Sequence, residues 1–199
     1  MWLMDMVFPV VIWEGEEPQG HLAIGDWEGI SLADYLSGNL SEEELARTRD
    51  PRTAKIYVSI EVVKQGREAV LAILAHELAH LLFRLYRIEL EGDEEEALAD
   101  RAALFALGVG PLPEVLAHCV RRQNRPPEAF LEWVERHLQW FEEAYGPLPP
   151  MDKQALKKLI QQYRDSVWHN EDLARRLAES RVEGGGRNAA GDGISRRGG

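Results

Sequence analysis

Apolar residues along the chain follow two different periods, and the two periods together predict a mixed fold. The segment 55–63, KIYVSIEVV, alternates β-branched residues and is typical of a strand, and residues 2–13 indicate one or two more short strands. The segment 67–87 is apolar on nearly every face as far as Phe83, which predicts a long helix buried in the middle of a domain.

Most of the remaining chain has the period and the boundary residues of helices. Ser41 followed by Glu44 forms a capping box that starts a short helix. Another helix opens near Asp93 and ends at the glycine-rich segment 108–113. Three more helices are expected after it, over 113–123, 126–145 and 151–181. We therefore predict a mostly helical α+β fold, in which a small sheet packs against the buried helix and a second functional helix, with C-terminal helices added.

The last predicted helix carries a heptad-like seam made of Leu156, Ile160, Tyr163, Val167, Asn170, Ala174 and Leu177. We favour a helix laid on its own domain, and a homodimer or partner contact through 151–181 is the alternative. The domain organisation that we predict is a core over 1–112 and a helical extension packed on it over 113–181. The segment 182–199 is rich in glycine and nearly free of apolar residues, so we expect a disordered tail there.

Composition and charge narrow the class of protein. The chain has 199 residues, and its 45% hydrophobic content is enough for a core. A formal net charge of −11 disfavours nucleic acid and anionic membranes as partners. The single cysteine, Cys119, excludes an internal disulfide and fits a reducing compartment. No apolar run reaches about 18 residues and the N-terminus lacks a basic region, so we expect a cytoplasmic protein without a membrane span or signal peptide.

The buried helix contains a concentrated group of polar residues. The segment AVLAILAHELAHLLF, residues 69–83, is apolar except for His76, Glu77 and His80. Residues four apart share a helix face, so the two imidazoles can hold one tetrahedral zinc ion. Glu77 lies about 100° round the helix, where it can reach a water held by the ion as the general base of an HExxH metalloprotease. Buried histidines are usually only hydrogen-bonded, but a cation also removes the cost of burying the carboxylate, which favours the metal site.

A zinc ion with an open position needs a third protein ligand, and the acidic run 91–104 lies nearest. Glu96 and Asp100 are four apart, so a ligand at 96 allows Asp100 to accept a hydrogen bond from a zinc-bound histidine. Glu95 shares its face with alanines, and we prefer Glu96 to Glu94 or Glu95 as the ligand. The alternative is a solvated acidic start of a helix, since carboxylates suit that position.

HELAH at 76–80 followed by EALAD at 96–100 resembles the HExxH…ExxxD pattern of gluzincin metallopeptidases. LAHELAHLL and EALADRAAL are similar to soluble relatives of the HtpX-like peptidases. The short gap between the motifs is closer to ImmA/IrrE-type peptidases, which act on repressors. The resemblance covers about residues 55–108. It implies that His76, His80 and Glu96 bind zinc, that Glu77 is the general base, that Asp100 orients His76, and that 55–63 is an edge strand that holds extended substrate.

These residues predict an enzyme that hydrolyses peptide bonds of a polypeptide substrate with Zn²⁺ as cofactor. Such a site also needs a donor for the oxyanion that develops on the carbonyl, and the candidates are His118, Tyr86, Arg121 and Tyr57. Two other functions stay open. One is a regulatory peptidase that acts on a repressor or partner protein, and the other is an inactive binding module that keeps zinc for stability. Glu77 favours an enzyme, because a structural zinc site needs no base.

Overall fold

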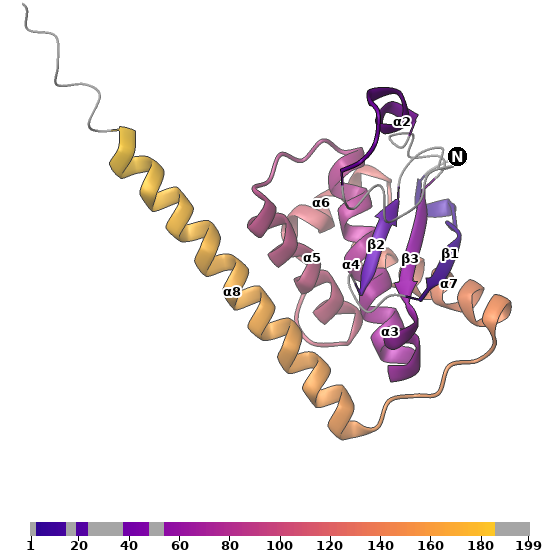
Figure 1. Cartoon of the computed structure of the whole chain (residues 1–199). Helices are drawn as coiled ribbons and strands as arrows, with labels where there is room; N and C mark the ends of the chain where they lie inside the picture. The colour runs from indigo at the N-terminus through magenta and orange to yellow at the C-terminus, as the bar shows by residue number, and fades with distance from the viewer. Residues whose placement is uncertain (1–2, 15–18, 24–37, 48–53, 186–199) are drawn as a thin grey trace, which may run out of the picture.

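The computed structural model describes residues 3–14, 19–23, 38–47 and 54–185, and it confirms the mostly helical α+β class (Figure 1). None of its helices, within these ranges, combines the length and the apolar composition that a membrane span requires. The elements in chain order are η1 (Leu3–Asp5), β1 (Val10–Trp13), β2 (Gly20–Ala23), α2 (Glu42–Arg47), β3 (Lys55–Ser59), α3 (Ile60–Gln65), α4 (Arg67–Leu85), α5 (Gly92–Ala106), α6 (Glu114–Arg122), α7 (Ala129–Tyr145) and α8 (Lys153–Gly185).

The three described strands form one mixed sheet with the order β1-β3-β2. β1 runs parallel to β3, and β2 runs antiparallel to it. Ile56 and Val58 of β3 are fully buried, which suits a central strand with neighbours on both sides. β2 is therefore an edge strand, and its outer edge has no strand partner among the described residues.

The predicted strand 55–63 is wrong in its length and in its place in the sheet. β3 ends at Ser59, whose hydroxyl accepts a hydrogen bond from the backbone N–H of Glu61 and so caps α3. Serine is a strong N-cap because it satisfies an N–H group that the helix leaves without a partner. The β-branched residues that follow therefore continue as a helix, with Val62 buried. Since β3 is central, the edge beside the site belongs to β2 instead.

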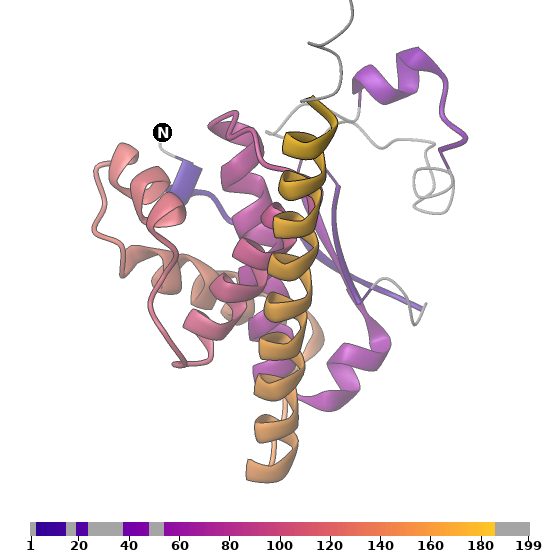
Figure 2. The ribbon, with the colours of Figure 1, turned by 90° about the vertical axis from the view of Figure 1, so that its left-hand side faces the viewer.

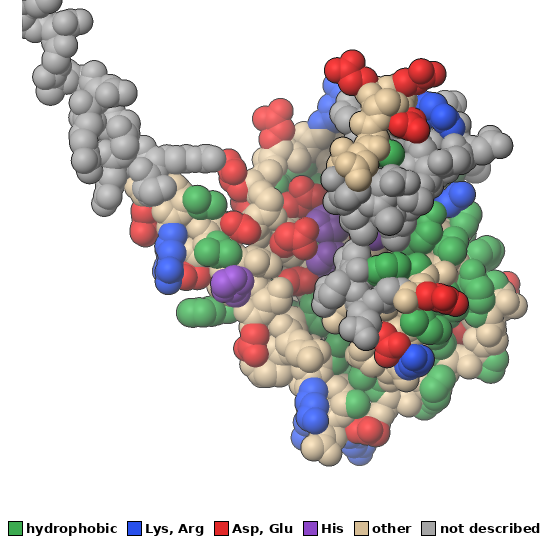
Figure 3. Space-filling view, viewed as in Figure 1, with side chains coloured by type: hydrophobic (Ala, Val, Ile, Leu, Met, Phe, Trp, Pro, Cys, Tyr) green, Lys and Arg blue, Asp and Glu red, His purple; other side chains and the backbone are tan. Residues whose placement is uncertain are grey.

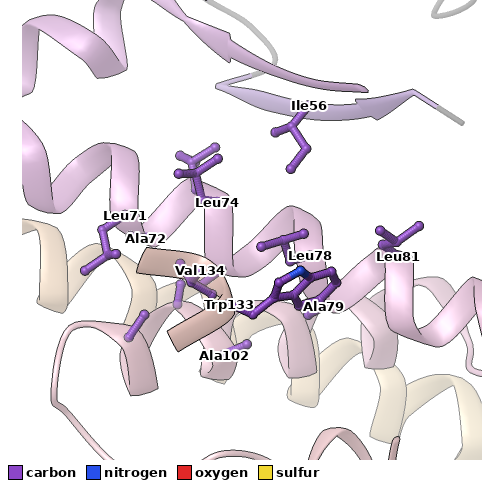
Figure 4. Packing of buried hydrophobic residues seen from close by; sticks show 14 of the residues in the cluster. Ile56, Leu71, Ala72, Leu74, Leu78, Ala79, Leu81, Ala102, Trp133 and Val134 are labelled. Atoms are coloured by element: carbon purple, nitrogen blue, oxygen red, sulfur yellow. The ribbon is translucent and has the colours of Figure 1, made fainter. Parts of the chain in front are cut away.

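α4 is the central element of the fold, as its apolar sequence predicts. Every side chain over 69–83 is buried except that of His76. In Figure 4, Leu74 points toward the sheet that carries Ile56, while Trp133 of α7 lies against the opposite side of α4. The helix is therefore enclosed by the sheet, α5 and α7, and polar groups on it can reach water only through an opening between these elements.

α7 ties the N-terminal segment to the core through His137. The backbone N–H of Phe8 donates to His137 Nε2 over 3.0 Å, and His137 Nδ1 donates to the carbonyl of Trp133 over 2.8 Å. Burial lowers the pKa of His137 to about 4, so the ring stays neutral and keeps both bonds. The indole of Trp133 donates in turn to the carbonyl of Met6 over 2.8 Å. One continuous core therefore joins residues before and after position 112.

α8 packs lengthwise on α5, as Figure 2 shows from outside. Val167 of the seam is buried, and the seam residues from Leu156 to Ala174 are otherwise partly buried, so this part of the seam faces the chain's own domain, which is the favoured interpretation of its heptad pattern, while Leu177 at its end is exposed. Residues 175–179 are exposed. The helix continues to Gly185, beyond the predicted end at 181, and the rest of the predicted tail lies outside the described residues.

Candidate metal centre

Three side chains from α4 and α5 bring ligand atoms to one point. His76 Nε2 and His80 Nε2 lie 3.0 Å apart, and the two oxygens of Glu96 face them, with Oε2 at 3.4 Å from His76 Nε2 and Oε1 at 3.4 Å from His80 Nε2. Ligand atoms of a tetrahedral zinc site, with bonds of about 2.0–2.1 Å, are about 3.3–3.4 Å apart. These nitrogens and carboxylate oxygens thus have nearly the spacing that a single zinc ion requires, and the cluster has the predicted composition.

The helix pair explains why residues distant in sequence meet here. His76 contacts Asp100, and His80 contacts Glu95, so α5 runs antiparallel to α4. α5 buries small side chains against its neighbours, namely Ala97, Ala99, Ala102, Ala103 and Ala106. Small residues let two helix backbones approach closely, which brings a short carboxylate side chain within reach of an imidazole.

A carboxylate holds the outer nitrogen of each histidine. His76 Nδ1 donates to Asp100 Oδ1 over 2.9 Å, and His80 Nδ1 donates to Glu95 Oε1 over 2.6 Å. These bonds keep the proton on Nδ1 and direct the Nε2 lone pairs into the site, as metal-binding histidines require. Asp100 has its predicted place. The hydrogen bond between Glu95 and His80 was not predicted, because Glu95 shares its own helix face only with alanines.

α8 takes part in the site through Asp100, which is almost fully buried. The hydroxyl of Ser166 donates to Asp100 Oδ2 over 2.5 Å, while Oδ1 faces His76. The side-chain amide of Asn170 donates to the Ser166 oxygen over 3.4 Å. A chain of hydrogen bonds thus connects α8 to a ligand histidine, and both oxygens of the buried carboxylate are satisfied.

A cleft of about 690 Å³ opens over the ligand atoms. In Figure 3, histidine side chains lie in the middle of the face between α5 and β2, with acidic side chains beside them. α4 and α5 supply the floor of the cleft. β2 supplies one wall, from Gln19 to Leu22, and α8 supplies another with Leu159, Gln162, Tyr163 and Ser166. The cluster of His76, His80 and Glu96 is therefore open to molecules larger than water.

Glu77 is buried at the base of the cleft and lies outside the cluster of ligand atoms. Burial raises its pKa, and the charges of His76 and His80 only partly oppose that increase. The backbone of β2 packs directly against it, because a Cβ added at Gly20 would lie 2.7 Å from Glu77 Oε1. A raised pKa and a fixed position both suit a general base.

The electrostatics of the cluster require a positive charge. Burial by itself lowers the pKa of His76, but the hydrogen bonds that His76 donates to Asp100 and Glu96, and the charge of Glu77, raise it to about 10. The bond to His76 also lowers the pKa of Glu96. In the metal-free fold a proton on His76 balances the carboxylates, and a divalent cation can take that place.

His118, predicted as an oxyanion donor, is not in the cleft. α6 turns Leu116, Cys119 and Val120 inward, which leaves His118 exposed on the opposite face of that helix. The other three candidates also lie outside the cleft lining. Arg121 pairs with Glu114, Tyr86 accepts a hydrogen bond from Gln123, and Tyr57 belongs to the central strand.

Tyr163 and His21, which were not among the predicted site residues, are two of the residues that line the cleft. Tyr163 of α8 has no hydrogen-bond partner for its hydroxyl among the described residues, and the oxygen is not sealed from solvent. Burial raises the pKa of Tyr163, and the charges of Asp100 and Glu77 raise it further, so the hydroxyl keeps its proton. His21 of β2 is the second residue. Burial, with the charges of Arg84 and His80, lowers its pKa to about 4, so its ring is neutral.

The chain has no match among family models, curated proteins or solved structures. The evidence for its function therefore comes from the geometry of the cleft and from the motif residues.

Zinc binding should distinguish the three neighbouring glutamates. Glu96→Gln should weaken zinc affinity by about 100-fold or more, because it removes a ligand. Glu95→Gln should weaken it by roughly 10- to 100-fold, because it removes the partner of His80 Nδ1. Glu94→Gln is the matched control, since Glu94 is exposed in the same turn, and should change affinity by less than about twofold. Competition with a chelator measures all three, and a larger loss for Glu94→Gln than for Glu96→Gln would contradict the assignment.

Zinc affinity should also rise with pH. The pKa of His76 in the metal-free fold is about 10, whereas that of the free side chain is 6.5. Binding of this proton therefore stabilises the fold fully below pH 6.5, and the stabilisation is lost as the pH rises through 10. Zinc must displace the proton, so the affinity should increase by about tenfold per pH unit in the neutral range. Asp100→Asn lowers the pKa of His76 and should shift this dependence to lower pH. Chelator competition at several pH values checks it, and a constant affinity would refute it.

Proposed function

We propose that the chain is a zinc-dependent peptidase. The observation that carries the proposal is the convergence of His76, His80 and Glu96 at zinc spacing in an open cleft, with Glu77 buried beside them. A bound zinc ion would lower the pKa of a water molecule and polarise a substrate carbonyl. The donor set of two imidazoles and one carboxylate, at the floor of an open cleft, is the kind that would hold catalytic zinc.

The protein's own groups move the proton. Glu77 accepts it from the attacking water and passes it to the amine that leaves as the peptide bond breaks. Its buried position raises its pKa, so it can serve first as a base and then as an acid. The close packing of Gly20 on Glu77 prevents the carboxylate from rotating away from the centre.

We assign the oxyanion donor to Tyr163 in place of His118. Its hydroxyl is protonated, accessible from the cleft and uses no other hydrogen bond among the described residues. Ser166, one turn along the same face of α8, is bonded to Asp100 and so anchors this part of the helix at the centre. A donor fixed before the reaction stabilises charge that appears only in the transition state.

The substrate is proposed to be an extended polypeptide that pairs with β2. No strand among the described residues pairs with the outer edge of β2, and its residues from Gly20 to Leu22 line the cleft. A peptide added at this edge passes beside Glu77, because β2 itself is packed on that residue. This arrangement replaces the pairing expected for 55–63.

The open cleft favours a peptidase over a zinc-stabilised binding module, since a structural zinc site is closed by four protein ligands. A peptidase that acts on a repressor or partner protein shares this chemistry and differs only in its substrate. The cytoplasmic location stays a prediction.

Glu77→Gln should lower the hydrolysis of an unfolded test protein by about 10²- to 10⁴-fold and leave one zinc bound per chain, because the variant removes the base and no ligand. Glu61→Gln is the control, since Glu61 is exposed and pairs only with Lys64. Equal rates for wild type and Glu77→Gln, with zinc bound in both, would favour the binding module.

Tyr163→Phe should lower kcat by about 10²- to 10³-fold with little change in KM or zinc content, because only a transition-state hydrogen bond is lost. Tyr145→Phe removes an exposed hydroxyl on α7 and serves as the matched control. Steady-state kinetics decide the assignment, and a kcat for Tyr163→Phe within about twofold of the control excludes it.

A further inference from the structure

Arg84 is a cation in a strongly acidic cleft and forms no ion pair with any other residue that the structure describes. It lies four residues after His80 and therefore on the same face of α4, and it lines the cleft. Four carboxylates line the same cleft, those of Glu77, Glu95, Glu96 and Asp100. Arg84 is the one lysine or arginine among the described residues that line it.

Three of the four carboxylates of the cleft already have partners, and Glu77, the fourth, interacts with the charge of Arg84 without forming an ion pair with it among the described residues. Glu95 is bonded to His80, and Asp100 is bonded to both His76 and Ser166. Glu96 faces both ligand histidines. Arg84 has no ion pair or hydrogen bond with any residue in the described ranges, and its side chain is exposed. Its guanidinium is thus free to bind a group from outside the chain.

We propose that Arg84 selects substrates that carry a carboxylate near the scissile bond. A planar guanidinium binds a carboxylate through two parallel hydrogen bonds, which gives it both affinity and orientation. The net charge of −11 does not attract acidic peptides from a distance, so this selectivity depends on the local contact. The inference rests on the proposed peptidase function and names its substrate class.

The spacing along α4 sets the position of that carboxylate. Arg84 lies about 6 Å beyond His80 along the helix axis, at 1.5 Å per residue. Extended chain rises about 3.3 Å per residue, so the carboxylate should stand about two residues from the scissile bond. Both a glutamate side chain and a free C-terminus provide this group.

The test measures peptide binding and hydrolysis with matched peptides. One set carries Glu or Gln at each position within three residues of a fixed cleavable bond, with an amidated C-terminus. In the second set every varied position carries Gln, and the peptide ends within three residues of the cleavable bond, either as a free acid or as an amide. Binding is measured to zinc-loaded Glu77→Gln, which turns nothing over, and kcat/KM is measured with wild type. The first set reports a side-chain carboxylate and the second a terminal one.

An acidic group in at least one set should improve binding and kcat/KM by about tenfold over its neutral match, and Arg84→Ala should bring that ratio to about one. Arg84→Glu should reverse the preference, so that the neutral peptide of each pair binds better than its acidic match. Arg164→Ala, an exposed arginine of α8 outside the cleft, should leave the ratio unchanged. No acidic preference, or one that survives Arg84→Ala, overturns the inference. Acid-selective binding without hydrolysis by wild type would leave the Arg84 site standing and refute the peptidase.

Discussion

The structure depends on neutralising a group of carboxylates buried beside an apolar helix. Glu77 and Asp100 are almost fully buried, and Glu95 and Glu96 adjoin the two histidines. Removing several negative charges from water is costly unless a positive charge lies among them. A proton on His76 supplies this positive charge, and a divalent cation between the imidazoles would supply it as well. A divalent cation would in addition act as a Lewis acid at the base of an open cleft.

The burial of Asp100 also explains why the peripheral helix α8 contributes to the site. Asp100 needs partners for both oxygens, and Ser166 supplies the second of them. That bond fixes the turn of α8 that carries Tyr163, so a group far along the chain becomes a wall of the cleft. Packing on α5 and the polar link to Asp100 therefore act together, and neither extends to the exposed residues 175–179.

Local spacing in the sequence was enough to predict the helices from α4 onward and the cluster of His76, His80 and Glu96. His76 and His80 share a face, as do Glu96 and Asp100, and both statements follow from the helical period alone. Helix boundaries followed from caps such as Ser41 with Glu44, whose predicted hydrogen bonds are present.

Contacts between separate elements could not be derived in this way. Glu95 reaches His80 only because α5 lies close to α4, and Tyr163 faces the cleft only because of how α8 is turned. The alternation over 55–63 is compatible with a strand throughout, and the Ser59 cap decides where it ends. His118 was predicted as a donor because its sequence neighbours are apolar. Those neighbours form the buried face of α6, and His118 itself lies on the exposed face.

A crystal structure of the zinc-loaded protein, with the ion located by its anomalous scattering, tests the central claim most directly. The account predicts one ion bonded to Nε2 of His76, Nε2 of His80 and a carboxylate oxygen of Glu96, with Asp100 and Glu95 on the two Nδ1 atoms. An ion held elsewhere, or a Glu96 side chain directed into solvent while zinc occupies the cleft, would contradict it.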